Sequence, residues 1–172
     1  MSHSIIKLSI LFLGAVVLIF LNRMVNDAFA PLSIHLSVIG LLAIFPALYL
    51  PLGQGFLCVI LIGLFWDTPL PYSALPFLLL DFTIIAFIKH RIRRQDYLQC
   101  SVIALIGNFF ILLFLALFNS KSSFFHFNYW LRIFTDILLS EIMILICCYW
   151  FFNFQKTLLD TFVKNKEEEE FL

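Results

Sequence analysis

Charged residues are scarce in this chain: Lys, Arg, Asp and Glu together make up 13% of its 172 residues. So little charge cannot cover the surface of a water-soluble globule, which excludes a soluble protein of this size. Hydrophobic residues make up 62% of the chain and aromatic residues 17%, and the mean hydropathy is +1.01. The composition therefore predicts an integral membrane protein, with the lipid bilayer as its solvent.

Sequence signatures of enzymes and metal sites are also missing. The chain has no H-E-x-x-H, P-loop or G-x-S-x-G pattern and no internal repeat. Its four cysteines lack C-x-x-C spacing, and its four histidines are widely scattered. We therefore expect a non-catalytic protein without metal or cofactor, whose thiols pack as small hydrophobic groups. Basic residues cluster in only one short loop, so nucleic-acid binding is not expected.

Apolar segments long enough to cross a bilayer recur along the chain. A hydrocarbon core of about 30 Å needs roughly 20 helical residues. The sequence predicts an all-α bundle of about six transmembrane helices, or five if the short third segment does not cross. The helices form one domain, 1–152, followed by a short charged tail, 153–172. The expected spans are 5–21, 32–50 with a kink at Pro46, about 54–66, about 74–88, 98–118 and about 133–152.

The first apolar segment has two interpretations. Lys7 precedes an apolar core, and residues 28–30, Ala-Phe-Ala, resemble the cleavage site of a secretory signal peptide. However, Arg23 and Asp27 lie between the core and that site, and Pro31 would directly follow the cut. These residues favour a retained membrane span.

A cluster of basic residues predicts the orientation of the bundle. Short loops rich in Lys and Arg remain on the cytoplasmic side, and six spans then place both termini in the cytoplasm. The hairpin tip at 67–73 faces the outside. The same cluster could also bind anionic lipid or a cytoplasmic partner. It consists of Lys89, Arg91, Arg93 and Arg94, with His90 among them.

Asp81 is an acidic residue about seven positions from either end of its expected span. An acid near the centre of a bilayer costs at least about 2.5 kcal/mol, so it must face the bundle interior, find a partner or be protonated. Asn108 and Arg132 are candidate partners, as are Gln54 and Ser73.

Further polar residues in the membrane predict a network. Arg132 and Asp136 are four residues apart and can pair on one helix face, with Glu141 deeper in the same span. Together with Asn108 they form the predicted polar network. Asp81 and Glu141 could form a proton or ion path, or these polar residues could only make contacts that hold helices together.

Gly63 and Asp67 share one helix face because they are four residues apart. A glycine here lets another backbone approach and supply hydrogen-bond donors to the carboxylate. The pair therefore indicates either a partner-binding or packing site, or an aspartate that ends its helix in interfacial water.

The segment Gly63-Leu64-Phe65-Trp66-Asp67, followed by a hydrophobic return and an arginine-rich loop, resembles the rod shape-determining protein MreD family. The chain departs from the usual pattern after the aspartate, where the family tends to have glycine and this chain has Thr68. The resemblance implies a scaffold of the cell-elongation machinery in the bacterial inner membrane. It implies binding to the bitopic protein MreC and regulation of lateral peptidoglycan synthesis, with RodA, a class B penicillin-binding protein and MreB as further partners.

The same resemblance raises an alternative function in transport. MreD-like proteins are similar in fold to the substrate-binding components of energy-coupling-factor vitamin transporters. In that case the acids of the sixth span and the aromatic loop at 119–130 would line an outward-facing pocket. A closed, polar pocket near the outer face would distinguish a transporter component from a scaffold.

Overall fold

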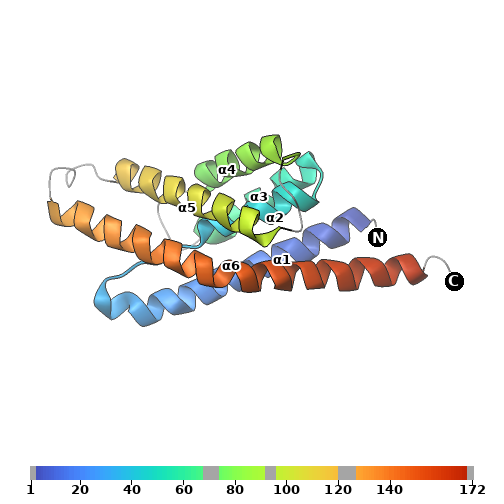
Figure 1. Ribbon diagram of the computed structural model, residues 1–172, viewed down its shortest axis with the longest axis horizontal. Helices are drawn as coiled ribbons and strands as arrows, with labels where there is room; N and C mark the ends of the chain where they lie inside the picture. Colours follow the sequence, from blue (N-terminus) through green and yellow to red (C-terminus); the bar gives the residue numbers. More distant parts are fainter. Residues whose placement is uncertain (1–2, 68–73, 92–95, 120–126, 170–172) are drawn as a thin grey trace.

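A computed structural model describes residues 3–67, 74–91, 96–119 and 127–169. All regular structure in these residues is helical, which confirms the all-α prediction. Among the described residues, three helices are long and apolar enough to cross a membrane, namely α1, α5 and α6. Both chain termini lie at the same end of the molecule (Figure 1). The helices are α1 (His3–Phe29), α2 (Ile44–Tyr49), α3 (Leu52–Asp67), α4 (Leu75–Ile88), α5 (Tyr97–Asn119) and α6 (Phe127–Glu169), with 3₁₀ turns η1 (Ala30–Leu32) and η2 (Ile39–Leu41).

Three of the expected spans agree closely with helices. The predicted segments 54–66, 74–88 and 98–118 correspond to α3, α4 and α5, whose ends differ from the prediction by at most two residues. These segments are apolar on all sides, so a helix is the structure that satisfies their backbone groups in lipid. With lengths of 16 and 14 residues, α3 and α4 are shorter than a full span.

The second expected span, 32–50, is not a continuous helix. Residues 33–38 are irregular, and helical structure begins only at Ile39. Every residue from 36 to 48 is buried, and we call this stretch the central segment. A broken backbone is tolerated at membrane depth only where protein encloses it, and the burial satisfies that condition.

Pro46 does not produce the kink predicted for it. It lies in the first turn of α2, which begins at Ile44. The first four backbone N–H groups of a helix have no partner within the helix, so a proline there removes no hydrogen bond. Pro46 therefore lies at the start of a helix, whereas the sequence analysis placed it in a helix interior.

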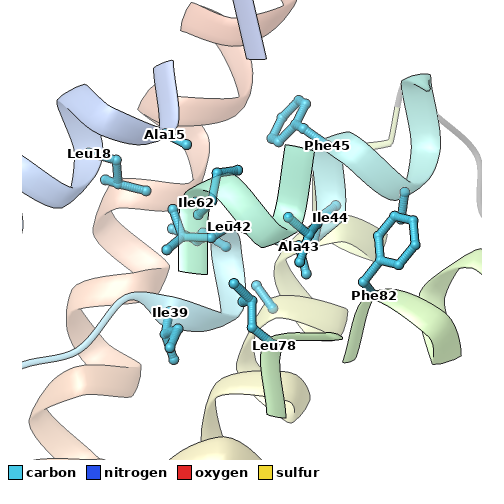
Figure 2. Close-up of a cluster of buried hydrophobic side chains, with 14 of the residues drawn as sticks. Ala15, Leu18, Ile39, Leu42, Ala43, Ile44, Phe45, Ile62, Leu78 and Phe82 are labelled. Atoms are coloured by element: carbon cyan, nitrogen blue, oxygen red, sulfur yellow. The ribbon is translucent and has the colours of Figure 1, made fainter. Parts of the chain in front are cut away.

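The hydrophobic core forms around the central segment. Figure 2 shows Leu42, Ala43 and Ile44 of this segment between Ala15 and Leu18 of α1 on one side and residues of α4 on the other. Helix α3 packs against α1, α2 and α4, whereas α6 packs against α1 and α5. The central segment thus occupies the position of a core, not that of a lipid-facing helix.

Helix α6 extends well beyond the expected end of the sixth span at 152. It runs for 43 residues and continues through residues that the sequence analysis assigned to the charged tail. Gln155 and Leu159 in this region are buried. The side chain of Gln155 lies against Gly14 of α1, where a larger residue would clash with it. Gln155 and Leu159 therefore pack within the bundle, although they lie in the stretch that the sequence analysis assigned to the tail.

Candidate functional site

Gly63 and Asp67 meet the start of α4. The Asp67 carboxylate accepts hydrogen bonds from the backbone N–H groups of Ala74 at 2.8 Å and Leu75 at 3.2 Å. The Leu75 side chain lies against Gly63, since a Cβ on this glycine would approach Leu75 Cδ1 to 2.6 Å. A carboxylate is favourable at a helix N-terminus, where N–H groups are unpaired. The glycine–aspartate face thus closes the hairpin between α3 and α4 with partners from this chain.

Arg23 of α1 holds the other side of this hairpin, a role that the sequence analysis did not assign. Its guanidinium donates to the carbonyl oxygens of Phe65 at 2.8 Å and Trp66 at 3.3 Å. The same group lies 5.3 Å from the centre of the Phe65 ring. These carbonyls belong to the last turn of α3, which lacks partners within the helix. The sequence signal was an isolated arginine close after a long apolar run.

Asn26 of α1 binds the irregular backbone that precedes the core. Its Nδ2 donates to the carbonyl oxygen of Leu36 at 2.7 Å, and its Oδ1 accepts from the Leu36 N–H at 2.7 Å. Asn22 Nδ2 donates to the same carbonyl at 3.3 Å. Both asparagines were missed by sequence reasoning. They supply the hydrogen bonds that residue 36 would have formed within a helix.

Helix α6 binds the opposite edge of the same backbone. Asp136 Oδ1 accepts from the N–H of His35 at 3.1 Å, and Ser140 Oγ accepts from the N–H of Ser37 at 2.9 Å. Asp136 and Ser140 are four residues apart and share a helix face. An extended chain presents alternate backbone groups to opposite sides, so residues 35–37 can bind α1 and α6 together.

Asn108 connects three elements. Its Nδ2 donates to Glu141 Oε1 of α6 at 3.1 Å, and its Oδ1 accepts from the N–H of Gly40 at 3.3 Å. Gly40 fits closely here, because an added Cβ would collide with the backbone of Ala104 and Asn108. The second carboxylate oxygen of Glu141 is buried without a hydrogen-bond partner. The network predicted from sequence therefore includes Asn108 and Glu141 in direct contact.

The expected ion pair between Arg132 and Asp136 is not formed. Within the described part of the chain, Asp136 binds the His35 backbone instead, and Arg132 lines a pocket. The backbone of residue 35 competes successfully because it has no helical partner of its own. The polar contact that Asp136 makes is therefore a hydrogen bond to backbone and not an ion pair.

Asp81 stands apart from this network. It is 9% exposed on α4, and its Oδ2 has no hydrogen-bond partner. Asn108, one of its expected partners, instead binds Glu141 and Gly40. Arg132, another expected partner, lines a pocket near the end of α1. Ser73 lies outside the described residues. The described residues therefore do not connect Asp81 and Glu141 into a proton or ion path.

A pocket of about 510 Å³ is lined in part by residues near the end of α1 and the start of α6. These two helix ends lie opposite the chain termini (Figure 1). The pocket is partly open. Its walls come from the end of α1, from residues 33–35, from Trp66 and from Arg132. Asn22 also lines this pocket and has a buried Oδ1 without a partner. The pocket can accept a small polar molecule, but it is not the closed cavity that would distinguish a transporter component.

The predicted basic cluster is described only in part. Lys89 is half-buried and Arg91 is exposed just beyond the end of α4, whereas Arg93 and Arg94 lie outside the described residues. The Arg91 N–H donates to the carbonyl oxygen of Ile88 at 2.8 Å, which forms a turn at this end of α4.

Among the described residues, no group of three His, Cys, Asp or Glu side chains could hold a metal ion. Comparison with models of known protein families, with curated proteins and with solved structures gives no match for this chain.

Proposed function

We propose that this protein is a non-catalytic scaffold of the bacterial cell-elongation machinery in the inner membrane. In this function it binds an MreC-like bitopic protein and thereby regulates lateral peptidoglycan synthesis and cell shape. RodA, a class B penicillin-binding protein and MreB are further members of the assembly. Both chain termini and the basic cluster at 89–94 face the cytoplasm.

One observation carries the proposal. Gly63 and Asp67, the residues on which the family resemblance depends, meet the first turn of α4 at a single junction. A short glycine–aspartate motif in a sequence is weak support for a family resemblance. The support is stronger when both residues contribute to the same structural contact. The junction sets the geometry of a hairpin at the expected outer face, where the outer segment of a bitopic partner could reach it.

Depletion of the protein in its rod-shaped host tests the proposal. Cells should become round or swollen during fast growth, and the MreC-like protein should co-purify with the tagged chain from native membranes. Asp67→Ala should reduce this co-purification while the chain still inserts into the membrane. Asp160→Ala, at an exposed position on α6, serves as the matched control. Unchanged cell shape after complete depletion would rule out the proposed function.

The pocket beside Arg132, although partly open, supports a second candidate, a membrane component that binds a small molecule for import. The pocket has a volume of about 510 Å³ and lies at the expected outer end. Native mass spectrometry of the purified chain distinguishes the candidates. A bound metabolite that is lost in Arg132→Ala, together with a co-purifying nucleotide-hydrolysing subunit, would favour the transport component over the scaffold.

A further inference from the structure

A groove between α4 and α5 runs along the side of the bundle. Its volume is about 400 Å³, and apart from Asp81 its lining is apolar. On α4 the lining residues recur every three or four positions from Phe77 to Ile88, and on α5 they do so from Ile103 to Phe114. Each stripe covers twelve residues, with about 17 Å of helix between its first and last positions. Two such stripes form the ridges between which a third helix packs.

Asp81 lies against the wall formed by α5. Its Oδ1 is 2.7 Å from the position of a Cβ on Gly107, so only glycine leaves room for the carboxyl group there. The side chain is 9% exposed, and its buried Oδ2 lacks a partner. The groove thus combines apolar walls with one buried acceptor that the bundle leaves unused.

Lipid chains cannot satisfy this acceptor. A carboxyl group in hydrocarbon is costly whether it is ionised or protonated, and the cost falls when a hydrogen-bond donor reaches it. A helix with apolar side chains would fill both stripes, and one donor on that helix would reach Asp81. A compact metabolite would not match an apolar groove of this length.

We propose that the groove between α4 and α5 binds one transmembrane helix of a partner protein, and that this helix donates a side-chain hydrogen bond to Asp81. The donor is Ser, Thr, Asn, Gln or Lys at the depth of Asp81. The assignment of this helix to the bitopic MreC-like protein rests on the proposed function, whereas the chemistry of the groove does not.

A synthetic helix tests the groove without reference to any natural partner. The probe is a leucine-rich single-span peptide with one central Asn, and the control probe has Leu at that position. Binding to the purified full chain in bilayers is followed by energy transfer, at peptide fractions where the probe alone is monomeric. We expect the Asn probe to bind roughly three- to thirty-fold more tightly, the range given by one interhelical hydrogen bond.

Three variants identify where the probe binds. Asp81→Leu should abolish the preference for Asn, and Ile106→Trp, at an exposed position in the groove, should weaken both probes. Leu13→Trp, at an exposed position on α1, should change neither. Equal binding of the two probes by the natural chain would overturn the inference. Energy transfer between two copies of the natural chain would also overturn the inference if the Asp81→Leu substitution abolishes it. In that case the groove would bind a second copy of this chain.

Photo-crosslinking separates this inference from the proposed function. A crosslinking residue at Ile84, in the groove, should capture the co-expressed MreC-like protein, and the same residue at Leu13 should not. Capture at Leu13 alone would overturn the assignment of the groove to this partner. The chain could instead prefer the Asn probe and yet form no crosslink to the MreC-like protein from Ile84 or from Leu13. This result would support helix binding in the groove and refute the scaffold function.

Discussion

Replacement of Asn26 by alanine tests how the irregular backbone is held in the bundle. The Asn26 amide makes two hydrogen bonds of 2.7 Å to the backbone of Leu36, one as donor and one as acceptor. Alanine leaves the Leu36 N–H without a partner inside the protein. The Leu36 carbonyl keeps a longer bond, 3.3 Å, from Asn22.

The expected loss in the free energy of unfolding follows from the Leu36 N–H and the Leu36 carbonyl. A buried N–H left unpaired costs about 1–3 kcal/mol, and a lost bond to a carbonyl that retains another donor costs about 0.5 kcal/mol. We therefore expect Asn26→Ala to lower the free energy of unfolding by about 2 kcal/mol. Asn22→Ala should cost less than 1 kcal/mol, because Asn26 still binds the carbonyl. The double variant should exceed the sum of the two, since the carbonyl then loses both donors.

Equilibrium unfolding in mixed micelles, followed by tryptophan fluorescence, measures these differences. Asn153→Ala, at an exposed position on α6, is the matched control and should be close to neutral. Equal stability of Asn26→Ala and Asn153→Ala would contradict the role assigned to Asn26. Simply additive effects of the Asn22 and Asn26 substitutions would show that the two side chains do not share the Leu36 carbonyl.

Three further predictions concern the core, the hairpin and the orientation. Gly40→Ala should destabilise the bundle by about 3 kcal/mol in the same unfolding assay, because the added Cβ meets backbone atoms of α5. Gly53→Ala, which meets nothing within 4 Å, should be neutral or stabilising. Asp67→Ala should cost about 1–2 kcal/mol through loss of the α4 cap, and a stability equal to that of the natural chain would contradict this role. In a cysteine-free background, Cys at His90 should be protected from an impermeant maleimide outside spheroplasts and Cys at Asn128 should react; the opposite pattern would invert the orientation.

Helices with apolar surfaces on all sides could be predicted from the sequence. The boundaries of α3, α4 and α5 follow from runs of apolar residues bounded by polar or proline-rich stretches, and a helix satisfies the backbone groups of such a run within the segment itself. Hydropathy alone does not separate a lipid-facing helix from a segment enclosed by protein. For this reason the segment 32–50 was predicted as a span, although its helical structure is broken and residues 36–48 are buried in protein.

The candidate site could be predicted only in part. Proximity along one helix correctly placed Gly63 and Asp67 on a common face. Asn22 and Asn26 were missed because their partners are backbone groups, which carry no sequence signature. The pair of Arg132 and Asp136 was predicted from spacing, but the unpaired backbone of His35 offered Asp136 a different partner.

The enclosed central segment has a consequence for biogenesis. Residues 36–48 are buried in protein, and the groups that bind the irregular backbone at 35–37 include Ser140 of the last helix. A nascent chain that ends at α5 therefore lacks α6, one of the helices that enclose the central segment. The central segment can therefore reach its final packing only after α6 has been synthesised, so truncation within α6 should leave this early part of the chain incompletely packed.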